Sequence, residues 1–355
     1  MKRHAKLTAL IGIAVLGLLL MTPTGCYLSR AGWEEVKILK GRRPIAGLVI
    51  DPAVDSATRV KLRLVLDARK FAGDSLNLRT RESFTTFSQL ESDTLVLVLS
   101  AAYRDKLEAY TWWFPIVGKV PYKGYFDFSQ ARRDARQLVG RGFDVYLRPS
   151  AAFSTLGFFN DPLLSTSLRE DTLDLANTVI HELTHNTFYA PGEAEFNESF
   201  ANFVGARGAA RLFRARGHEK AAQEIEARWK DEKLLGGFWG RLHHTLDSAY
   251  AVHPNDREAR LRARDTVYQR ARVALVFDLG PKLHTIGPRY VERVRLDNAA
   301  LLARRVYLTD LELFDQVLAK EGGNLTAAIE KIIALAKSNA EEPYAAVRSY
   351  LAGSP

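Results

Sequence analysis

The chain has 355 residues and a formal net charge of +9, and 47% of its residues are hydrophobic. This composition supports a substantial core and excludes a disordered protein, while the single cysteine excludes a disulfide framework. Residues 207–216 and 257–264 are rich in arginine, but apolar and acidic residues recur between the arginines at helical spacing. We therefore interpret both stretches as solvated helix faces and predict no binding of nucleic acid.

The N-terminal residues have the pattern of a secretory signal. Three basic residues lie among the first six, residues 7–21 carry no charge, and Thr22-Pro23-Thr24-Gly25 leads to Cys26. The uncharged run is shorter than the roughly 20 apolar residues that a membrane-spanning helix requires. We therefore predict that residues 1–25 are a signal peptide and not a permanent span.

Cys26 follows Gly25 at the position where such a signal peptide is cut. This pattern resembles the lipobox of bacterial lipoproteins, in which a small residue precedes a cysteine that is acylated and becomes the mature N-terminus. Pro23 stands where that pattern usually has leucine, and an ordinary signal peptide with an incidental cysteine is the alternative. The resemblance implies a lipid on Cys26 that anchors the protein in the bacterial cell envelope. Tyr27 in place of aspartate implies the outer membrane, facing the periplasm.

Residues 26–165 alternate between short β-rich runs and helical ones. Residues 94–99 (TLVLVL), 116–120 and 144–147 (DVYL) are predicted as strands. Residues 57–71 and 129–140 have the apolar spacing of amphipathic helices. We therefore expect an α/β part that contains a small sheet.

Residues 166–355 are almost wholly helical in pattern. Apolar residues recur at spacings of three and four in five segments, which are 193–216, 218–235, 256–277, 298–318 and 325–337. Gly217, Gly236-Gly237 and Gly322-Gly323 are interpreted as helix stops. The expected fold class is therefore α+β, mostly helical, with a small sheet followed by a helical part that carries the site described next.

A helix that carries His181-Glu182-x-x-His185 is expected from residue 168 to residue 189. Ser167 and Glu170 have the form of a capping box, and Pro191-Gly192 stops the helix. The two histidines are one turn apart on one face, a spacing at which two imidazoles bind one zinc ion. Glu182 lies about 100° around the helix, from where it can reach a water molecule and take its proton as a general base.

Glu198 completes this motif through its distance from the helix break. Residues 190–191 lie midway between the histidine pair and Glu198, and both helices rise about 1.5 Å per residue. An antiparallel hairpin therefore brings Glu198 level with the histidines. His181, His185 and Glu198 then hold one zinc ion per chain, with water in the fourth position, as in catalytic zinc sites. Asn202, one turn further on, either hydrogen-bonds a ligand from the outer shell or faces solvent.

Asn197-Glu198-x-x-Ala201 after His-Glu-x-x-His resembles the gluzincin metallopeptidases, in which a glutamate on a downstream helix is the third zinc ligand. Further stretches resemble a family of bacterial lipoproteins described as predicted aminopeptidases, and this resemblance covers most of the mature chain. These stretches are WFPIVG (113–118), YKGYF (122–126), FSTLG (153–157), DPL (161–163), HELTH (181–185) and FNESFA (196–201).

The resemblance implies a zinc peptidase with Glu182 as its base. The sequence has no Gly-x-Met-Glu-Asn stretch, with which better-known zinc aminopeptidases of gluzincin type recognise the free amine of the substrate. Exopeptidase and endopeptidase cleavage therefore both stay open. Residues 151–157 are expected either as an edge strand to which a substrate peptide adds or as a buried corner.

The donor that stabilises the oxyanion is the least defined part of the site. Related enzymes use a tyrosine or histidine from a downstream element. The candidates are Tyr307, His243, His244 and Tyr290, each of which can also be structural, and we favour Tyr307 because it lies in a helix that can pack on the site.

The leading hypothesis is a membrane-anchored zinc metallopeptidase that hydrolyses peptide bonds. One alternative is a non-catalytic peptide-binding or scaffold lipoprotein that kept the fold; the intact Glu182 speaks against it, because zinc binding does not require that carboxylate. The other is a zinc hydrolase that acts on a non-peptide amide. Turnover of a peptide library separates the three.

Overall fold

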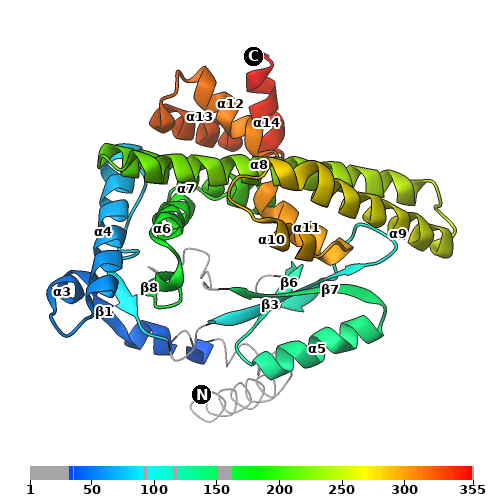
Figure 1. Cartoon of the computed structure of the whole chain (residues 1–355), viewed down its shortest axis with the longest axis horizontal. Helices are drawn as coiled ribbons and strands as arrows, with labels where there is room; N and C mark the ends of the chain where they lie inside the picture. Colours follow the sequence, from blue (N-terminus) through cyan, green and yellow to red (C-terminus); the bar gives the residue numbers. More distant parts are fainter. Residues whose placement is uncertain (1–31, 35, 91–93, 115–117, 151–161, 354–355) are drawn as a thin grey trace, which may run out of the picture.

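The computed structural model describes residues 32–34, 36–90, 94–114, 118–150 and 162–353. The protein is α+β and mostly helical, as predicted, with a small sheet before a largely helical part (Figure 1). The predicted signal peptide, Cys26 and the predicted edge strand at 151–157 lie outside the described residues. In the described part of the chain, no helix is both long and apolar enough to cross a membrane.

The predicted helices, and the predicted strands at 94–99, 116–120 and 144–147, have counterparts in the described residues, with different ends, and the structure adds short helices and strands that were not predicted. The helices are α3 (Ile45–Ile50), α4 (Ser56–Leu76), α5 (Phe128–Gly140), α6 (Thr172–Thr187), α7 (Ala194–Ala215), α8 (Glu219–Ala251), α9 (Arg257–Val273), α10 (Pro288–Arg293), α11 (Asn298–Leu308), α12 (Leu311–Lys320), α13 (Leu325–Ser338) and α14 (Pro343–Leu351). The strands are β1 (Arg42–Pro44), β2 (Thr86–Ser88), β3 (Val96–Tyr103), β4 (Trp112–Phe114), β5 (Gly118–Val120), β6 (Tyr122–Tyr125), β7 (Phe143–Ser150) and β8 (Leu163–Leu164).

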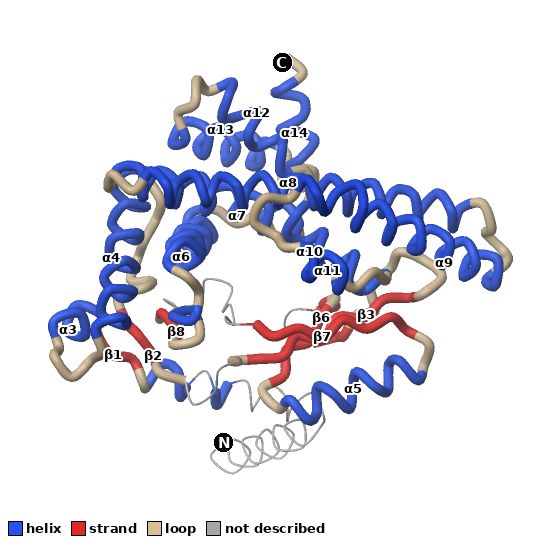
Figure 2. The backbone as a smooth tube through the Cα atoms, in the orientation of Figure 1, coloured by secondary structure: helices blue, strands red, loops and turns tan. Residues whose placement is uncertain are grey.

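The central sheet has the strand order β6-β3-β7 and is antiparallel throughout. It lies between α5 on one face and α11 on the other (Figure 2). Because side chains alternate along a strand, Leu99, Tyr125 and Val145 pack toward α5. Tyr146 and Arg148 point to the opposite face, where they meet side chains of α11. The sheet therefore presents one polar face to the helical part of the molecule.

Helices α6 and α7 form the hairpin that was predicted around residues 190–191, and α4 and α8 pack against it. Phe196, Phe200 and Phe203 of α7 are buried, and their rings pack edge-on or tilted against Phe314 of α12. The main hydrophobic cluster runs from Ile45 to Val347 and so includes residues on both sides of residue 165. The predicted boundary at residue 165 between an α/β part and a helical part stays a prediction.

Helix α8 continues through Gly236-Gly237, so the predicted stop there was wrong. A Cβ atom at position 236 would lie 2.6 Å from the carbonyl oxygen of Leu308. Gly236 therefore permits close packing of α8 against the end of α11, and neither glycine ends the helix. The predicted single helix 298–318 is broken at the same contact, where Asp310 has a positive φ of 49°. Tyr344 holds this break by donating its hydroxyl to Thr309 O at 3.0 Å.

The start of α6 also differs from the prediction. Residues Ser167–Arg169 form a 3-10 turn, and α6 begins at Thr172. Its cap is Asp171, whose carboxylate accepts the backbone N–H groups of Leu173 and Asp174, both at 2.9 Å. A charged acceptor at the positive end of the helix dipole is a stronger cap than the predicted serine.

The predicted helix 256–277 also differs from the structure. It changes after Val273 into a π-helical segment, Ala274–Leu279.

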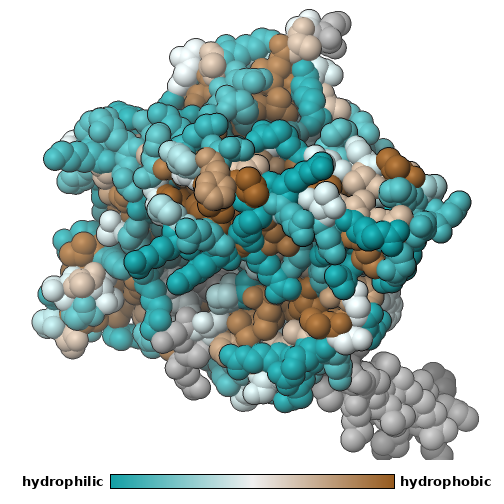
Figure 3. Space-filling model, turned by 45° about the vertical axis from the view of Figure 1, so that its right-hand side comes forward, coloured by the Kyte–Doolittle hydropathy of each residue, from teal (hydrophilic) through white to brown (hydrophobic). Residues whose placement is uncertain are grey.

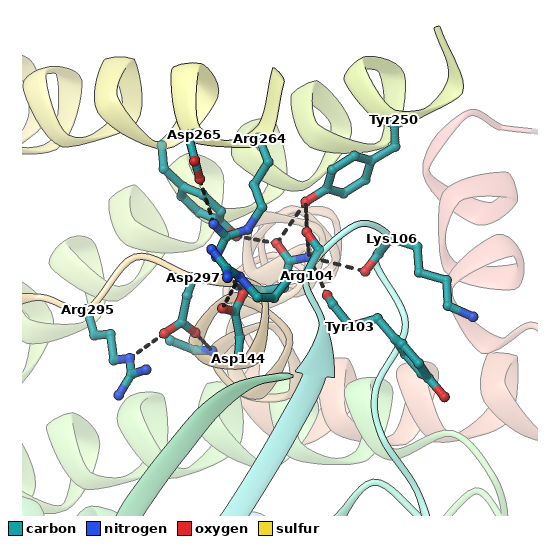
Figure 4. A network of polar contacts seen from close by, with 12 residues as sticks. Tyr103, Arg104, Lys106, Asp144, Tyr250, Arg264, Asp265, Arg295 and Asp297 are labelled. Carbon is teal, nitrogen blue, oxygen red and sulfur yellow. Dashed lines mark hydrogen bonds and ion pairs between the residues drawn. The ribbon is translucent and has the colours of Figure 1, made fainter. Parts of the chain in front are cut away.

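Arg264 of α9 is buried, contrary to the prediction of a solvated helix face. Its guanidinium donates to Asp144 of β7 at 2.6 Å (Figure 4). Asp144 also accepts the backbone N–H of Asn298 at 3.0 Å, and the Asn298 side chain accepts the hydroxyls of Tyr268 and Tyr250. We refer to these five residues as the Asp144 network. It joins the end of the sheet to α8, α9 and α11.

The surface shown in Figure 3 is mostly hydrophilic, with hydrophobic residues in separate patches. The large hydrophobic side chains that are exposed come from different elements, among them Ile50 of α3, Trp113 of β4 and Phe277 of the π-helical segment. They therefore do not mark one helix or one strand as a contact surface.

Candidate active site

The turn between α6 and α7 is fixed by a buried amide clamp. Asn197 donates to Ala190 O at 2.7 Å and accepts the N–H of Ala190 at 2.8 Å. Gly192 takes a φ of 87°, a conformation that glycine adopts without strain. The clamp folds α7 back along α6, and the residue after Asn197 is Glu198.

Close packing of the two helices depends on Gly205. A Cβ atom at this position would lie 2.2 Å from Oδ1 of Asn177 and 3.2 Å from Cβ of His181. Any side chain here would push α7 away from the helix that carries the histidines. Gly205 therefore sets the distance between the two sides of the site.

His181, His185 and Glu198 converge on one point. The two Nε2 atoms are 3.2 Å apart, His181 Nε2 is 3.4 Å from Glu198 Oε2, and His185 Nε2 is 3.7 Å from Glu198 Oε1. Two ligand atoms that are each about 2.0–2.1 Å from a tetrahedral zinc ion lie roughly 3.3 Å apart. The three residues, which we refer to as the ligand cluster, therefore fit the predicted metal, and the hairpin geometry is as predicted. Their role as ligands stays a prediction.

The pKa values of the three side chains in the ligand cluster are shifted in different directions. Burial works against a charge on His181, but its hydrogen bond to Glu198 and the charges of Glu182 and Glu198 raise its pKa. Burial also works against a charge on Glu198, but His181 and then His185 lower its pKa. Burial and the neighbouring His181 lower the pKa of His185 to about 4. At neutral pH, His185 is therefore a neutral imidazole, which is the form that binds metals.

Asn202 and Glu182 both lie near His181. Asn202 is half-buried, helps to raise the pKa of His181 and donates to the carbonyl oxygen of Tyr307 at 2.8 Å. It therefore faces a predicted ligand and not the solvent. Glu182 is partly buried on the next position of α6, close enough for its charge to raise the pKa of His181.

Of the four oxyanion candidates, Tyr307 lies beside the ligand cluster. Burial and the charge of Glu198 raise its pKa, and Arg148 works in the opposite direction. Tyr290 is exposed on α10, and His244 is exposed on α8. Partial burial of the His243 ring and then the charge of Arg305 lower the pKa of His243. The described contacts of Tyr290, His243 and His244 do not bring them to the ligand cluster.

The sequence did not lead us to predict three further residues that lie near the ligand cluster. Arg148 of β7 helps to lower the pKa of Glu198. Tyr122 on β6 is half exposed, and partial desolvation of its hydroxyl and the charge of Glu198 raise its pKa. Burial raises the pKa of Glu232 on α8 to about 7, against the effect of His181. Tyr122 falls in the YKGYF stretch noted above, but Arg148 and Glu232 belong to no motif, because only the packing of β7 and α8 brings them here.

Comparison with known proteins identifies a family for this chain. No curated protein and no solved structure matches the chain. One protein family matches residues 26–347, a span that includes the ligand cluster and most of the chain. Its description is "Putative aminopeptidase". The chain is therefore a member of this aminopeptidase family.

Proposed function

We propose that the protein is a zinc-dependent peptidase in which His181, His185 and Glu198 hold one zinc ion and Glu182 is the general base. The observation that carries this proposal is the convergence of two imidazole nitrogens and a carboxylate at 3.2–3.7 Å. Two histidines and one glutamate are the ligand set of catalytic zinc sites, which keep one position open. The family supports a peptide as the substrate.

The chemistry of the ligand cluster supports a bound cation. Three atoms that can each offer a lone pair face one another, and His185 is neutral because burial lowers its pKa to about 4. A bound cation satisfies all three atoms at once, whereas a proton satisfies two. When bound, zinc supplies a Lewis acid that polarises carbonyls and acidifies water.

Glu182 moves the proton in the proposed reaction. Water adds to the carbonyl carbon of the peptide while Glu182 accepts its proton, and the C–N bond breaks as Glu182 passes that proton to the departing amine. Tyr307, beside Glu198, is the best placed of the candidates to donate its O–H to the oxygen of the reacting carbonyl. Asn202 holds the ring of His181 in orientation and ties it to α11.

We propose in addition that the protein is anchored by a lipid on Cys26 in the outer membrane of a bacterial cell envelope, facing the periplasm. This rests on the signal-like residues 1–25 and on the position of the single cysteine directly after them. A peptidase held there would act on peptides in the periplasm.

Replacement of Glu182 by glutamine separates catalysis from metal binding. Glutamine keeps the shape of the side chain but cannot accept the proton. Glu182→Gln should retain zinc and thermal stability and lose peptide cleavage by at least about 100-fold, because general bases contribute roughly 10²–10⁴ in rate. Glu198→Ala is the matched variant and should lose zinc and cleavage together. Zinc content, thermal unfolding and cleavage of a peptide library are measured for all three proteins.

The outcomes distinguish the alternatives. A wild-type protein that holds zinc but cleaves no peptide would favour the scaffold protein or a hydrolase of a non-peptide amide. Wild-type rates in Glu182→Gln would contradict the general-base role. Full zinc content in Glu198→Ala would require a different third ligand.

A further inference from the structure

Arg148 is a cation beside the ligand cluster that the proposed reaction does not use. It is half-buried near the end of β7 and donates to the hydroxyl of Tyr307 at 3.4 Å. Its guanidinium carbon lies 5.7 Å from the centre of the Tyr307 ring. In the described part of the chain, no carboxylate forms an ion pair with Arg148. A tyrosine hydroxyl occupies one of its five N–H donors and leaves the planar fork available.

The strand register places Arg148 on the face of the sheet that meets α11, the helix that carries Tyr307. Arg148 pairs with Val98, and Tyr146 and Tyr122 both pair with Ser100 on the central strand. Residues directly opposite one another on neighbouring strands share a face, as do residues two apart along a strand. Tyr122 and Arg148 therefore lie on the same face, which is the face that meets α11. The charge of Glu198 acts on Tyr122, and the charge of Arg148 acts on Glu198.

Charge balance in the ligand cluster does not require this arginine. Two neutral imidazoles and one carboxylate leave a divalent cation with a net positive charge, so a guanidinium nearby is repelled. An anion placed between the two relieves that repulsion. Arginine pairs with carboxylates through two parallel hydrogen bonds, which fix the orientation of the bound group. Tyr122 and Tyr307 flank this position with hydroxyl groups that can also donate.

We propose that Arg148 binds a carboxylate of the substrate next to the reacting peptide bond, so that the enzyme prefers peptides that carry a negative charge there. The charge can come from the C-terminus of a short peptide or from an acidic side chain. The inference rests on the proposed peptidase function and specifies the class of its substrates. Arg148 is a specificity-determining residue in this proposal, with Tyr122 and Tyr307 as its neighbours.

The test uses one peptide that the wild type cleaves, with its cleaved bond located by mass spectrometry. The peptide is prepared with a C-terminal carboxylate or amide and, in a second pair, with glutamate or glutamine next to the cleaved bond. The wild type should prefer the charged member of one pair by roughly 10- to 100-fold in kcat/KM, the size of one charge-assisted pair. Arg148→Gln should lose that preference through KM, and Arg148→Lys should keep part of it. The pair that shows the preference identifies the source of the carboxylate.

Direct binding gives a second readout that does not depend on turnover. Dissociation constants for the same peptides are measured by calorimetry on zinc-loaded Glu182→Gln, with and without Arg148→Gln. The charged member should bind more tightly only where Arg148 is present. Arg133→Gln is the matched control, because Arg133 is exposed on α5, which packs on the other face of the sheet. Zinc content and thermal unfolding confirm that each variant is folded.

Several outcomes would overturn the inference. Equal kcat/KM for both members of each pair, or a preference that survives in Arg148→Gln, would show that no carboxylate binds there. An equal fall in kcat on every peptide would place Arg148 at the reacting carbonyl instead. If the wild type neither cleaves nor binds any peptide, the proposed function fails and this inference fails with it, whereas cleavage without selectivity overturns the inference alone.

Discussion

The Asp144 network and the ligand cluster are both groups of charged and polar side chains, but they differ in how their polar atoms find partners. In the Asp144 network, each charge faces an opposite charge or a donor of this chain, as in the 2.6 Å contact of Arg264 with Asp144. In the ligand cluster, the shortest contact joins two imidazole nitrogens at 3.2 Å. The atoms there are imidazole nitrogens and carboxylate oxygens, and in the proposed function a cation from outside the chain binds all three side chains.

We expect this difference to separate residues that serve the fold from residues that serve the proposed function. A buried ion pair that is already complete gains nothing from a ligand, and its loss leaves an uncompensated charge. A group of converging acceptors destabilises the empty protein and gains free energy when a cation binds. Substitutions in the first group should therefore change folding alone, and substitutions in the second should change metal binding.

The largest expected effect is on the Asp144 network. Arg264→Ala should lower the free energy of unfolding by about 3–5 kcal/mol, because it leaves Asp144 buried without its main partner. Zinc affinity of the folded variant should equal that of the wild type. Urea unfolding and competition with a chelator measure the two quantities. Arg262→Ala, exposed two residues away on α9, is the control. A loss of zinc in the still-folded Arg264→Ala protein would break the distinction between the two groups.

A smaller effect is expected where the fold and the site share a residue. Gly205→Ala should cost about 1–3 kcal/mol of stability, typical of overpacking, because its Cβ would contact Asn177 and His181. It should also weaken zinc binding, since α7 moves away from α6 and carries Glu198 with it. Gly240→Ala is the control, because a Cβ there meets no atom within 4 Å. Unchanged zinc affinity in a destabilised Gly205→Ala protein would show that the helix spacing does not govern the site.

The smallest expected effect is on the pH dependence of the free energy of unfolding. It comes from the carboxylate of Asp315. Burial works against its charge, but its bonds to Lys233, Arg207 and Trp229 lower its pKa below the ordinary 3.8. The ionised group therefore stabilises the fold fully above pH 3.8, and this contribution is lost as the pH falls below 3.8 through the lowered pKa. The stability difference between the wild type and Asp315→Asn should shrink over that range.

Urea unfolding at a series of pH values measures this difference. Asp247→Asn, exposed on α8, should show no such trend. A difference for Asp315→Asn that stays constant through the acid range would mean that its charge does not support the fold.

The sequence by itself determined the local parts of this protein. Helical spacing alone puts His181 and His185 on one face, and the breaker at Pro191-Gly192 lies at the position that brings Glu198 opposite them. The helix periodicity and the β-rich runs were also sufficient to predict a mostly helical α+β fold. These features depend on residues close in sequence, because a helix repeats its geometry every few residues.

The remaining features depend on contacts between distant parts of the chain, which only the tertiary structure shows. Gly236 was predicted to end a helix, but it lies inside α8 because the Leu308 carbonyl packs against it. Arg264 was predicted in solvent, but it is buried against a strand 120 residues away in sequence. Arg148 and Tyr307, 159 residues apart, meet only because α11 packs on the sheet. Contacts over such separations leave no periodic trace in the sequence, since each side chain is specified by neighbours that the chain brings together only when it folds.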